Sequence, residues 1–279
     1  MRMYQAKDLI GPIKRMCIAC NRVLPEDVRV RLQALKEEED SPAALSALED
    51  IIHNYQLAEE SQMPICQDTG MALVFIWLGE DVFLQGDLQA AVNEGVRQGY
   101  TEGYLRKSIV SDPLRRVNTG DNTPAALYLF RVPGDQIKIT VAPKGFGSEN
   151  MGRLKMLRPG DGVEGVKDFV VETVKIAGPN PCPPIVVGVG IGGNFDKVAL
   201  AAKLSLLRET GTHNPDPYYA DLENELYDLI AQTGVGAQGY GGRSTALAVH
   251  VEALPTHIAG LPVAVNINCH ATRHMTEVL

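Results

Sequence analysis

The stretch PNPCPPIVVGVGIGGNFDKV, residues 179–198, narrows the range of possible folds more than any other part of the chain. A β-branched run bounded by proline and glycine is typical of a buried strand, and the segment after the glycines has the composition of a helix. A strand that turns through glycine into a helix is the repeating unit of α/β folds. The stretch also contains Cys182 and the pattern Gly188-x-Gly190-x-x-Gly193, which has the spacing of a dinucleotide-binding fingerprint.

The rest of the chain interleaves helical and strand patterns. Apolar residues recur at helical spacing through residues 5–60, and Pro133-Gly134-Asp135 is turn chemistry between two strands that we expect to pair. We predict an α/β fold in which an N-terminal helical region, 1–60, precedes a mixed β-sheet flanked by helices, 61–279. Glycine- and proline-rich loops would carry the functional residues, within a single catalytic domain 1–279. Strands are expected at 71–79, 126–132, 136–142, 183–193, 245–255 and 260–269, and later helices at 86–105, 163–178, 195–207 and 221–234.

Composition excludes several classes of protein. The chain has 279 residues, of which 45% are hydrophobic, so it can bury a sizeable core. Its net charge of -8 argues against nucleic-acid binding, which needs surplus positive charge, although a small anion could still bind where basic residues gather. Because no segment reaches the roughly 18 apolar residues of a membrane helix, we expect a soluble, cytoplasmic protein with no membrane partner.

The five cysteines fall into two groups. Cys17 and Cys20 lie within a helical pattern, and we interpret them as packed apolar side chains rather than as half of a zinc or redox site. Cys66, Cys182 and Cys269 each lie in a loop beside a predicted strand. Three cysteines are too few for a closed zinc site but suit a 4Fe-4S cluster with one iron that has no protein ligand. From spacing alone, three buried structural cysteines remain the commoner alternative.

Five motifs strengthen the cluster interpretation. The chain resembles the α chain of the two-subunit class I (iron-sulfur) fumarate hydratases and their L-tartrate dehydratase relatives, from about residue 5 onward. The motifs that carry the resemblance are PICQDTG at 64–70, LRKSIVSDPLRRVNTGDNTPA at 105–125, PKGFGSENMGRLKMLRPGDG at 143–162, NPCPPIVVGVGIGGNFDKV at 180–198 and LPTHIAGLPVAVNINCHATRH at 254–274.

The resemblance implies a role for each motif. The glycines of 188–193 would form the strand-to-helix turn behind Cys182. Asp68 would handle a proton at the substrate hydroxyl, and Arg106 would pair with a substrate carboxylate. The cluster ligands would be Cys66, Cys182 and Cys269, and the substrate would also meet Gln67, the Gly147 backbone N–H and His257.

The function that the resemblance implies is reversible hydration of fumarate to L-malate, with the open iron as Lewis acid. L-Tartrate or mesaconate could be the substrate instead. The family's remaining substrate-binding residues lie on a β chain, so we expect a separate β subunit and an α2β2 assembly.

Two other classes of function stay open at this point. One is an NAD-binding oxidoreductase domain that uses Gly188–Gly193, with Glu209 near the distance expected of a ribose-binding acid. The other is a non-catalytic assembly subunit with structural cysteines. Each site residue also has a structural alternative: Asp68 as a turn residue, Arg106 as a helix-dipole partner and His257 as a buried histidine. We interpret His270 and His274 as supporting or structural residues.

Overall fold

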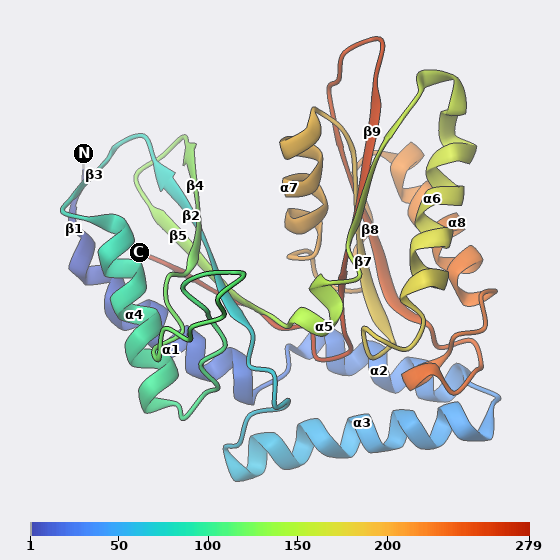
Figure 1. Ribbon diagram of the computed structural model, residues 1–279, viewed down its shortest axis with the longest axis horizontal. Helices are drawn as coiled ribbons and strands as arrows, with labels where there is room; N and C mark the ends of the chain where they lie inside the picture. Colours follow the sequence, from blue (N-terminus) through green and yellow to red (C-terminus); the bar gives the residue numbers. More distant parts are fainter. Residues whose placement is uncertain (1) are drawn as a thin grey trace. The chain divides into compact units, whose positions relative to one another are not determined.

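The computed structural model describes residues 2–279, which form two compact units (Figure 1). The first unit contains the chain up to Pro25, Tyr55–Phe146 and Arg273–Leu279, and the second contains Glu26–Asn54 and Gly147–Thr272. Helix α3, Pro42–Ser61, begins in the second unit and ends in the first. That residues 1–279 act as a single catalytic domain stays a prediction, because it concerns function and not compactness.

The first unit is built on a four-stranded sheet in the order β10-β5-β2-β4. The central strand β2 pairs with β4 in parallel and with β5 in antiparallel orientation, so the expected direct pairing of 126–132 with 136–142 is wrong. The turn at 133–135 instead leads the chain across β2. The elements are β1 (Arg2–Gln5), η1 (Ala6–Leu9), α1 (Ile10–Arg22), β2 (Met71–Gly79), β3 (Val82–Gln85), α4 (Leu88–Glu102), β4 (Ala126–Val132), β5 (Ile137–Lys144) and β10 (Met275–Val278).

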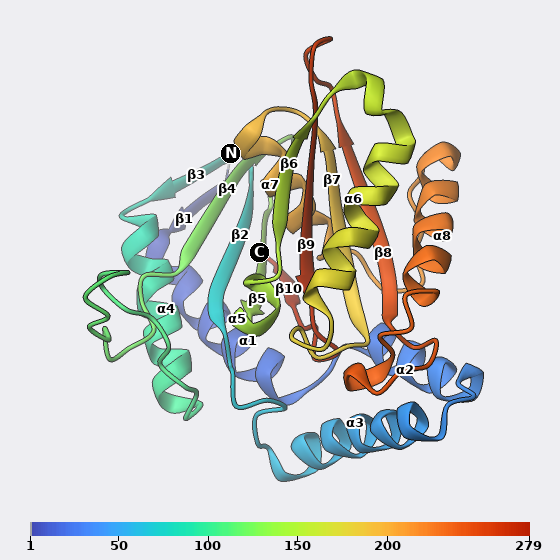
Figure 2. The same ribbon diagram turned by 45° about the vertical axis from the view of Figure 1, so that its right-hand side comes forward.

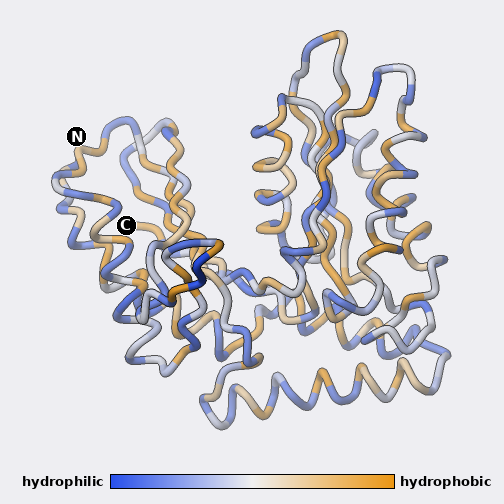
Figure 3. Tube along the Cα trace, viewed as in Figure 1, coloured by the Kyte–Doolittle hydropathy of each residue, from blue (hydrophilic) through white to orange (hydrophobic). Residues whose placement is uncertain are grey.

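Helices α1 and α4 pack together, and their apolar sides form one core with the sheet. Ile13 and Met16 of α1, Val92 and Tyr100 of α4, and Val74 of β2 are all fully buried in this core. The helices are amphipathic, which Figure 3 shows as alternating hydrophilic and hydrophobic colours along their turns. Burial of this apolar stripe is the main stabilising contribution to such helices.

The second unit is a three-layer α/β structure. Its sheet has the order β6-β9-β7-β8, with β7 parallel to β8 and antiparallel to β9. Helix α7 covers one face, whereas α6 and α8 cover the other, as Figures 1 and 2 show. The elements are α2 (Glu26–Glu38), β6 (Arg153–Leu157), η2 (Pro159–Asp161), α6 (Gly162–Ala177), β7 (Ile185–Gly192), α7 (Phe195–Ser205), α8 (Pro217–Ala231), η3 (Ala237–Gly239), β8 (Ala246–Leu254) and β9 (Leu261–Asn268); the short α5 (Phe146–Glu149) begins at the last residue of the first unit.

Side-chain caps fix where three helices begin. Asp87 accepts a hydrogen bond from the Ala90 N–H at the start of α4, and Asn194 accepts one from the Lys197 N–H at the start of α7. Asp216 caps α8, whose first residue is Pro217. These caps satisfy amide groups that lack a partner within the helix, and proline is favoured at the first position because it has no N–H to satisfy.

The glycines of the fingerprint pattern are packing residues. Gly188 and Gly190 lie inside β7, where an added Cβ would stand 2.3 Å from Ala202 O and 2.2 Å from Val198 O of helix α7. They let α7 lie directly against the strand. Of the three glycines in the pattern only Gly193, with φ +70°, lies in the strand-to-helix turn. The turn expected from the resemblance is therefore right for Gly193 and wrong for the other two, and the dinucleotide-binding interpretation is contradicted.

The predicted class, α/β with a helical N-terminal region and mixed sheets flanked by helices, is confirmed. The predictions missed β1, β3, β6 and β10, which are four or five residues long and leave little room for a period-two pattern. They also did not anticipate that the strands divide among three sheets. No helix within residues 2–279 is long and apolar enough to cross a membrane.

Candidate functional site

The five cysteines differ sharply in burial, as the sequence predicted. Cys17 and Cys20 are 0% and 3% exposed on the inner side of α1. Burial raises the pKa of the Cys20 thiol to about 12 and that of Cys17 further still, and the Cys20 thiol donates to Val141 O. Protonated buried thiols are poor ligands, because a metal binds the thiolate. Cys66 and Cys269 are half-buried, and Cys182 is exposed.

Cys66 lies in the loop between α3 and β2, in the first unit. Its sulfur is 3.4 Å from the Asp68 backbone N–H, which donates to it, and 3.4 Å from Gln67 Oε1. The Gln67 side chain is exposed beside it.

Three hydrogen bonds hold Asp68 in a fixed orientation, two to its carboxylate and one to its carbonyl. Its Oδ1 accepts from the Gly70 N–H at 3.0 Å, and its Oδ2 accepts from the Phe146 N–H at 2.9 Å. Its carbonyl accepts from the guanidinium of Arg273, a residue only 4% exposed, at 2.7 Å. The Gly70 bond is the turn contact of the structural alternative, whereas the bond to the distant Phe146 amide goes beyond a local turn.

Arg106 is attached to the same loop through its backbone. The Thr69 hydroxyl accepts from the Arg106 N–H at 2.9 Å and lies 3.3 Å from the Arg106 carbonyl. Buried Asn122 and Tyr100 both donate to the Gly70 carbonyl, which ties residues 105–122 to the loop. The Arg106 guanidinium is exposed and makes no hydrogen bond or ion pair with residues 2–279. It is open to an anionic ligand.

Cys182 and Cys269 come together in the second unit. Cys182 precedes β7 and Cys269 follows β9, and these antiparallel strands pair Val186 with Asn268. The backbone N–H of His270 donates to the Cys182 carbonyl at 3.3 Å, and His270 Nδ1 is 3.0 Å from the same oxygen. His270 therefore acts as a supporting residue in this structure, consistent with its interpretation from the sequence.

Gly147 and His257 occupy very different places in the second unit. An added Cβ on Gly147 would stand 3.5 Å from Asn180 O, two residues before Cys182. His257 is exposed in the loop between β8 and β9, at the end of β7 opposite to Cys182. The eight residues of β7 span roughly 26 Å at about 3.3 Å per residue. The structure thus gathers Gly147, Cys182 and Cys269 and leaves His257 far from them.

The residues present fit a thiolate-held cluster in their chemistry. The three cysteines of the family motifs are the accessible ones, and the other two are sealed in a core. Cys66 belongs to one compact unit and the remaining pair to the other, so neither unit alone contains all three. Within residues 2–279, no three His, Cys, Asp or Glu side chains are gathered closely enough to hold a metal ion.

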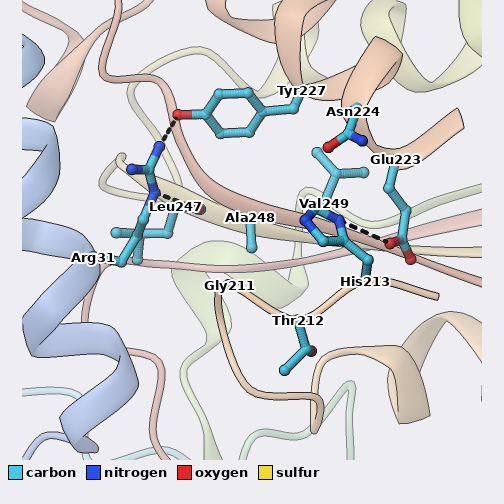
Figure 4. A pocket seen from close by; sticks show the side chains of 10 residues that line it. All are labelled: Arg31, Gly211, Thr212, His213, Glu223, Asn224, Tyr227, Leu247, Ala248 and Val249. Atoms are coloured by element: carbon cyan, nitrogen blue, oxygen red, sulfur yellow. Dashed lines mark hydrogen bonds and ion pairs between the residues drawn. The ribbon is translucent and has the colours of Figure 1, made fainter. Parts of the chain in front are cut away.

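Besides a cavity of about 450 Å³ lined by residues of β6 and α6, two cavities lie in the second unit. One of about 270 Å³ follows the outer edge of β8, and Figure 4 shows that Arg31 and Glu223 line it. Their charged groups are already used, since Arg31 donates to Tyr227 and Glu223 pairs with Arg208. It contains none of the predicted site residues. The other, of about 640 Å³, is lined by α3 and by Gln238, Tyr240 and His270, the last of which contacts the Cys182 loop.

Residues 11–278 match the model of the family described as fumarate hydratase (Fumerase). The chain belongs to this family. It is 44% identical over 257 residues to a Methanocaldococcus jannaschii protein whose provisional name is L(+)-tartrate dehydratase subunit alpha, with 90% of each chain covered. It is 34% identical to the L(+)-tartrate dehydratase subunit alpha of Escherichia coli K12 and to that of Shigella sonnei, with 91% of this chain and 84% of either relative covered.

The sequence predictions missed the residues that hold this family's motifs in shape. Arg273 and Asn122 lie inside the quoted motifs, as RH and GDN, but nothing in a lone arginine or asparagine signals burial. Gln238 lies in GVGAQGYGG, residues 234–242, outside all five motifs. The signal that could have found it is a lone long polar side chain in a glycine-rich turn.

Proposed function

We propose that the chain is the α subunit of a hydro-lyase that interconverts fumarate and L-malate together with a separate β subunit. The proposal is based on which cysteines are accessible. The three cysteines of the family motifs are the accessible thiols, and the family model spans residues 11–278. The relatives named as alpha subunits support the β partner.

In the proposed enzyme, Cys66, Cys182 and Cys269 hold a 4Fe-4S cluster. The cluster would supply a Lewis acid through the iron that lacks a protein ligand. The chain's own residues bind and orient the substrate. The open Arg106 guanidinium presents a planar fork of donors that suits a carboxylate. Gln67 offers an amide beside Cys66.

Asp68 is the proposed proton-handling group at the substrate hydroxyl. Each carboxylate oxygen accepts one backbone N–H and keeps lone-pair capacity for a further contact. Because both oxygens are anchored, the carboxylate is preorganised and needs no rotation to meet the substrate. The Gly147 N–H is a second proposed donor, and the base at C3 is assigned to the β chain.

His257 needs a different arrangement. At the far end of β7 it does not reach the Cys182 end of its own sheet. In an α2β2 assembly the proposed role of His257 is as a donor to the site of the other α chain, which symmetry allows.

L-Tartrate is a second candidate substrate, since the three relatives are named as L(+)-tartrate dehydratase subunits. It differs from malate by one hydroxyl, and a single side chain in the pocket can decide between the two. Mesaconate, with a methyl group on fumarate, is the third acid to assay.

The test is anaerobic co-expression with the β chain, reconstitution with iron and sulfide, and assays with fumarate, L-malate, L-tartrate and mesaconate. We expect about four irons per α chain and a three-iron EPR signal after mild oxidation, both lost in Cys182→Ser. Turnover of fumarate above L-tartrate supports the first substrate, and the reverse order supports the second. A chain that binds no iron would contradict the proposal and leave a non-catalytic assembly role.

A further inference from the structure

The loop that carries Cys182 has almost no means of holding its own shape. Residues 181–184 are Pro-Cys-Pro-Pro, and proline has no amide N–H. The Cys182 N–H, which donates to Pro179 O at 2.9 Å, is therefore the single backbone donor of these four residues. Cys182 itself has φ +53°, a left-handed conformation that residues other than glycine rarely adopt. The carbonyl oxygens must be held from outside.

Gln238 provides that support. The Pro183 carbonyl accepts two hydrogen bonds from it, one from the backbone N–H at 2.8 Å and one from the side-chain Nε2 at 2.8 Å. These use both lone pairs of the oxygen. Nε2 also lies 3.1 Å from Nδ1 of His270, and the backbone N–H of His270 donates to the preceding carbonyl, that of Cys182, at 3.3 Å. Two consecutive carbonyls on the C-terminal side of the loop are thus held by Gln238 and His270.

Gln238 has a backbone conformation that glycine would adopt more easily. Its φ is +52°, and its neighbours in this turn include Gly236, Gly239 and Gly241, all with positive φ. Glycine at position 238 would adopt this backbone conformation without strain. A glutamine in this conformation is costly unless its amide is needed.

The turn is itself anchored at both sides. An added Cβ on Gly239 would stand 2.5 Å from Pro179 Cβ, so the turn lies directly against the start of the Cys182 loop. On the other side the buried Glu39 carboxylate accepts from the N–H groups of Arg243 and Ser244. The turn that carries Gln238 is therefore held in place on both sides.

We propose that Gln238 is a positioning residue for the proposed cluster ligand Cys182, acting through the Pro183 carbonyl and His270. The role of Cys182 as a cluster ligand rests on the proposed function. The support of its loop by Gln238 rests on the hydrogen bonds alone. Gln238→Met keeps the length of the side chain and removes the amide. Gln62 offers a matched control, because it has φ +55° and its Nε2 donates to Glu59 O at 2.8 Å.

The first measurement uses the chain without iron. Hydrogen exchange is followed by mass spectrometry of a peptide spanning 179–187, whose four prolines contribute no amide. Of its five amides, those of Ile185, Val186 and Val187 lie in β7, so a change in fast exchange reports on the loop amides of Asn180 and Cys182. We expect Gln238→Met to accelerate exchange there about tenfold and Gln62→Met to leave it unchanged. Equal exchange in Gln238→Met and wild type would overturn the inference.

The second measurement uses the reconstituted enzyme. Gln238→Met should take up as much iron as wild type but lose it to a chelator about fivefold faster, with an altered three-iron EPR line shape and a thermal midpoint like that of Gln62→Met. An unchanged rate and line shape would overturn the positioning role. A wild-type chain that binds no iron would instead refute the proposed function, and the exchange experiment would still decide the geometry.

Discussion

At the residue scale, the chemistry of a side chain in this protein depends on where its element buries it. Cys17 and Cys182 are the same residue type, yet one is sealed under α1 and the other is exposed before β7. An exposed thiol can be reached by a reagent or a metal, whereas a buried thiol such as that of Cys17 stays protonated. The same contrast separates the exposed guanidinium of Arg106 from the buried one of Arg273.

Alkylation of the iron-free chain should follow this division. At pH 8 a thiol of pKa about 12 is ionised to about one part in ten thousand, so Cys20 should be protected, and Cys17 more so. Cys66, Cys182 and Cys269 should react with iodoacetamide under native conditions, and all five should react in denaturant. Peptide mass spectrometry measures each rate. Native labelling of Cys17 as fast as Cys182 would disprove the assignment.

Arg106→Ala should raise the KM for the dicarboxylate at least about tenfold, because it removes a charged donor that is open to ligand. The thermal midpoint should hardly move, since the guanidinium has no partner within residues 2–279. Steady-state kinetics of the αβ enzyme check this. Arg115→Ala, in the same loop and also exposed, is the control and should leave KM unchanged. Equal KM values for the two variants would remove Arg106 from the substrate site.

At the scale of elements, the second unit depends on how closely α7 lies on its sheet. The glycines of β7 leave room for the helix. The buried His250 of β8 also contacts it, since its Nδ1 lies 3.1 Å from Ser205 O at the end of α7. Both act across the interface between helix and sheet. Neither belongs to the proposed site.

Gly190→Ala should lower the free energy of unfolding by more than about 2 kcal/mol, because the new Cβ would overlap Val198 O and force α7 away. Gly160→Ala is the control, since a Cβ there meets nothing within 4 Å. Urea denaturation of both variants gives the comparison. A Gly190→Ala protein as stable as the Gly160→Ala protein would show that α7 does not need the close contact.

His250 should make stability depend on pH. Burial lowers its pKa to about 4, and the nearby Arg208 adds to the effect, whereas Glu223 and Asp27 oppose it. The unfolded state, with a pKa near 6.5, binds the proton more readily, so this contribution is complete above pH 6.5 and is lost as the pH falls toward 4. The loss should approach about 3 kcal/mol. Denaturation between pH 4 and 7 should show a shallower slope for His250→Asn, and an equal slope would contradict the assignment.

At the scale of the whole molecule, the proposed site needs more than one chain. The β subunit would complete the substrate pocket, and His257 would serve the neighbouring α chain. The chain alone contains the proposed cluster ligands, Asp68 and Arg106. Isolated α chains should therefore bind iron but turn over little substrate.

Mixing two inactive variants tests the role of His257. With random pairing in α2β2, co-refolded Cys182→Ser and His257→Ala chains should recover about one quarter of wild-type activity. Half of the assemblies would then be mixed, and each would contain one complete site. Mixtures with Cys182→Ser and Asp68→Asn, which are assigned to the same site, should recover none. If the first mixture recovers no activity, His257 does not act in the site of the other α chain.

The sequence by itself determined the fold class and the motifs. Strand and helix patterns are local, so the α/β class and the long helices could be predicted, and the five motifs led to the family. Short strands such as β6 and the place of β4 beside β2 could not, because strand partners are chosen by burial across the whole sheet. The tertiary structure alone decided that Gly188 packs against α7, that His257 lies at the far end of β7, and that Gln238 holds the Cys182 loop. Each depends on contacts between residues distant in the chain, which spacing along the sequence does not encode.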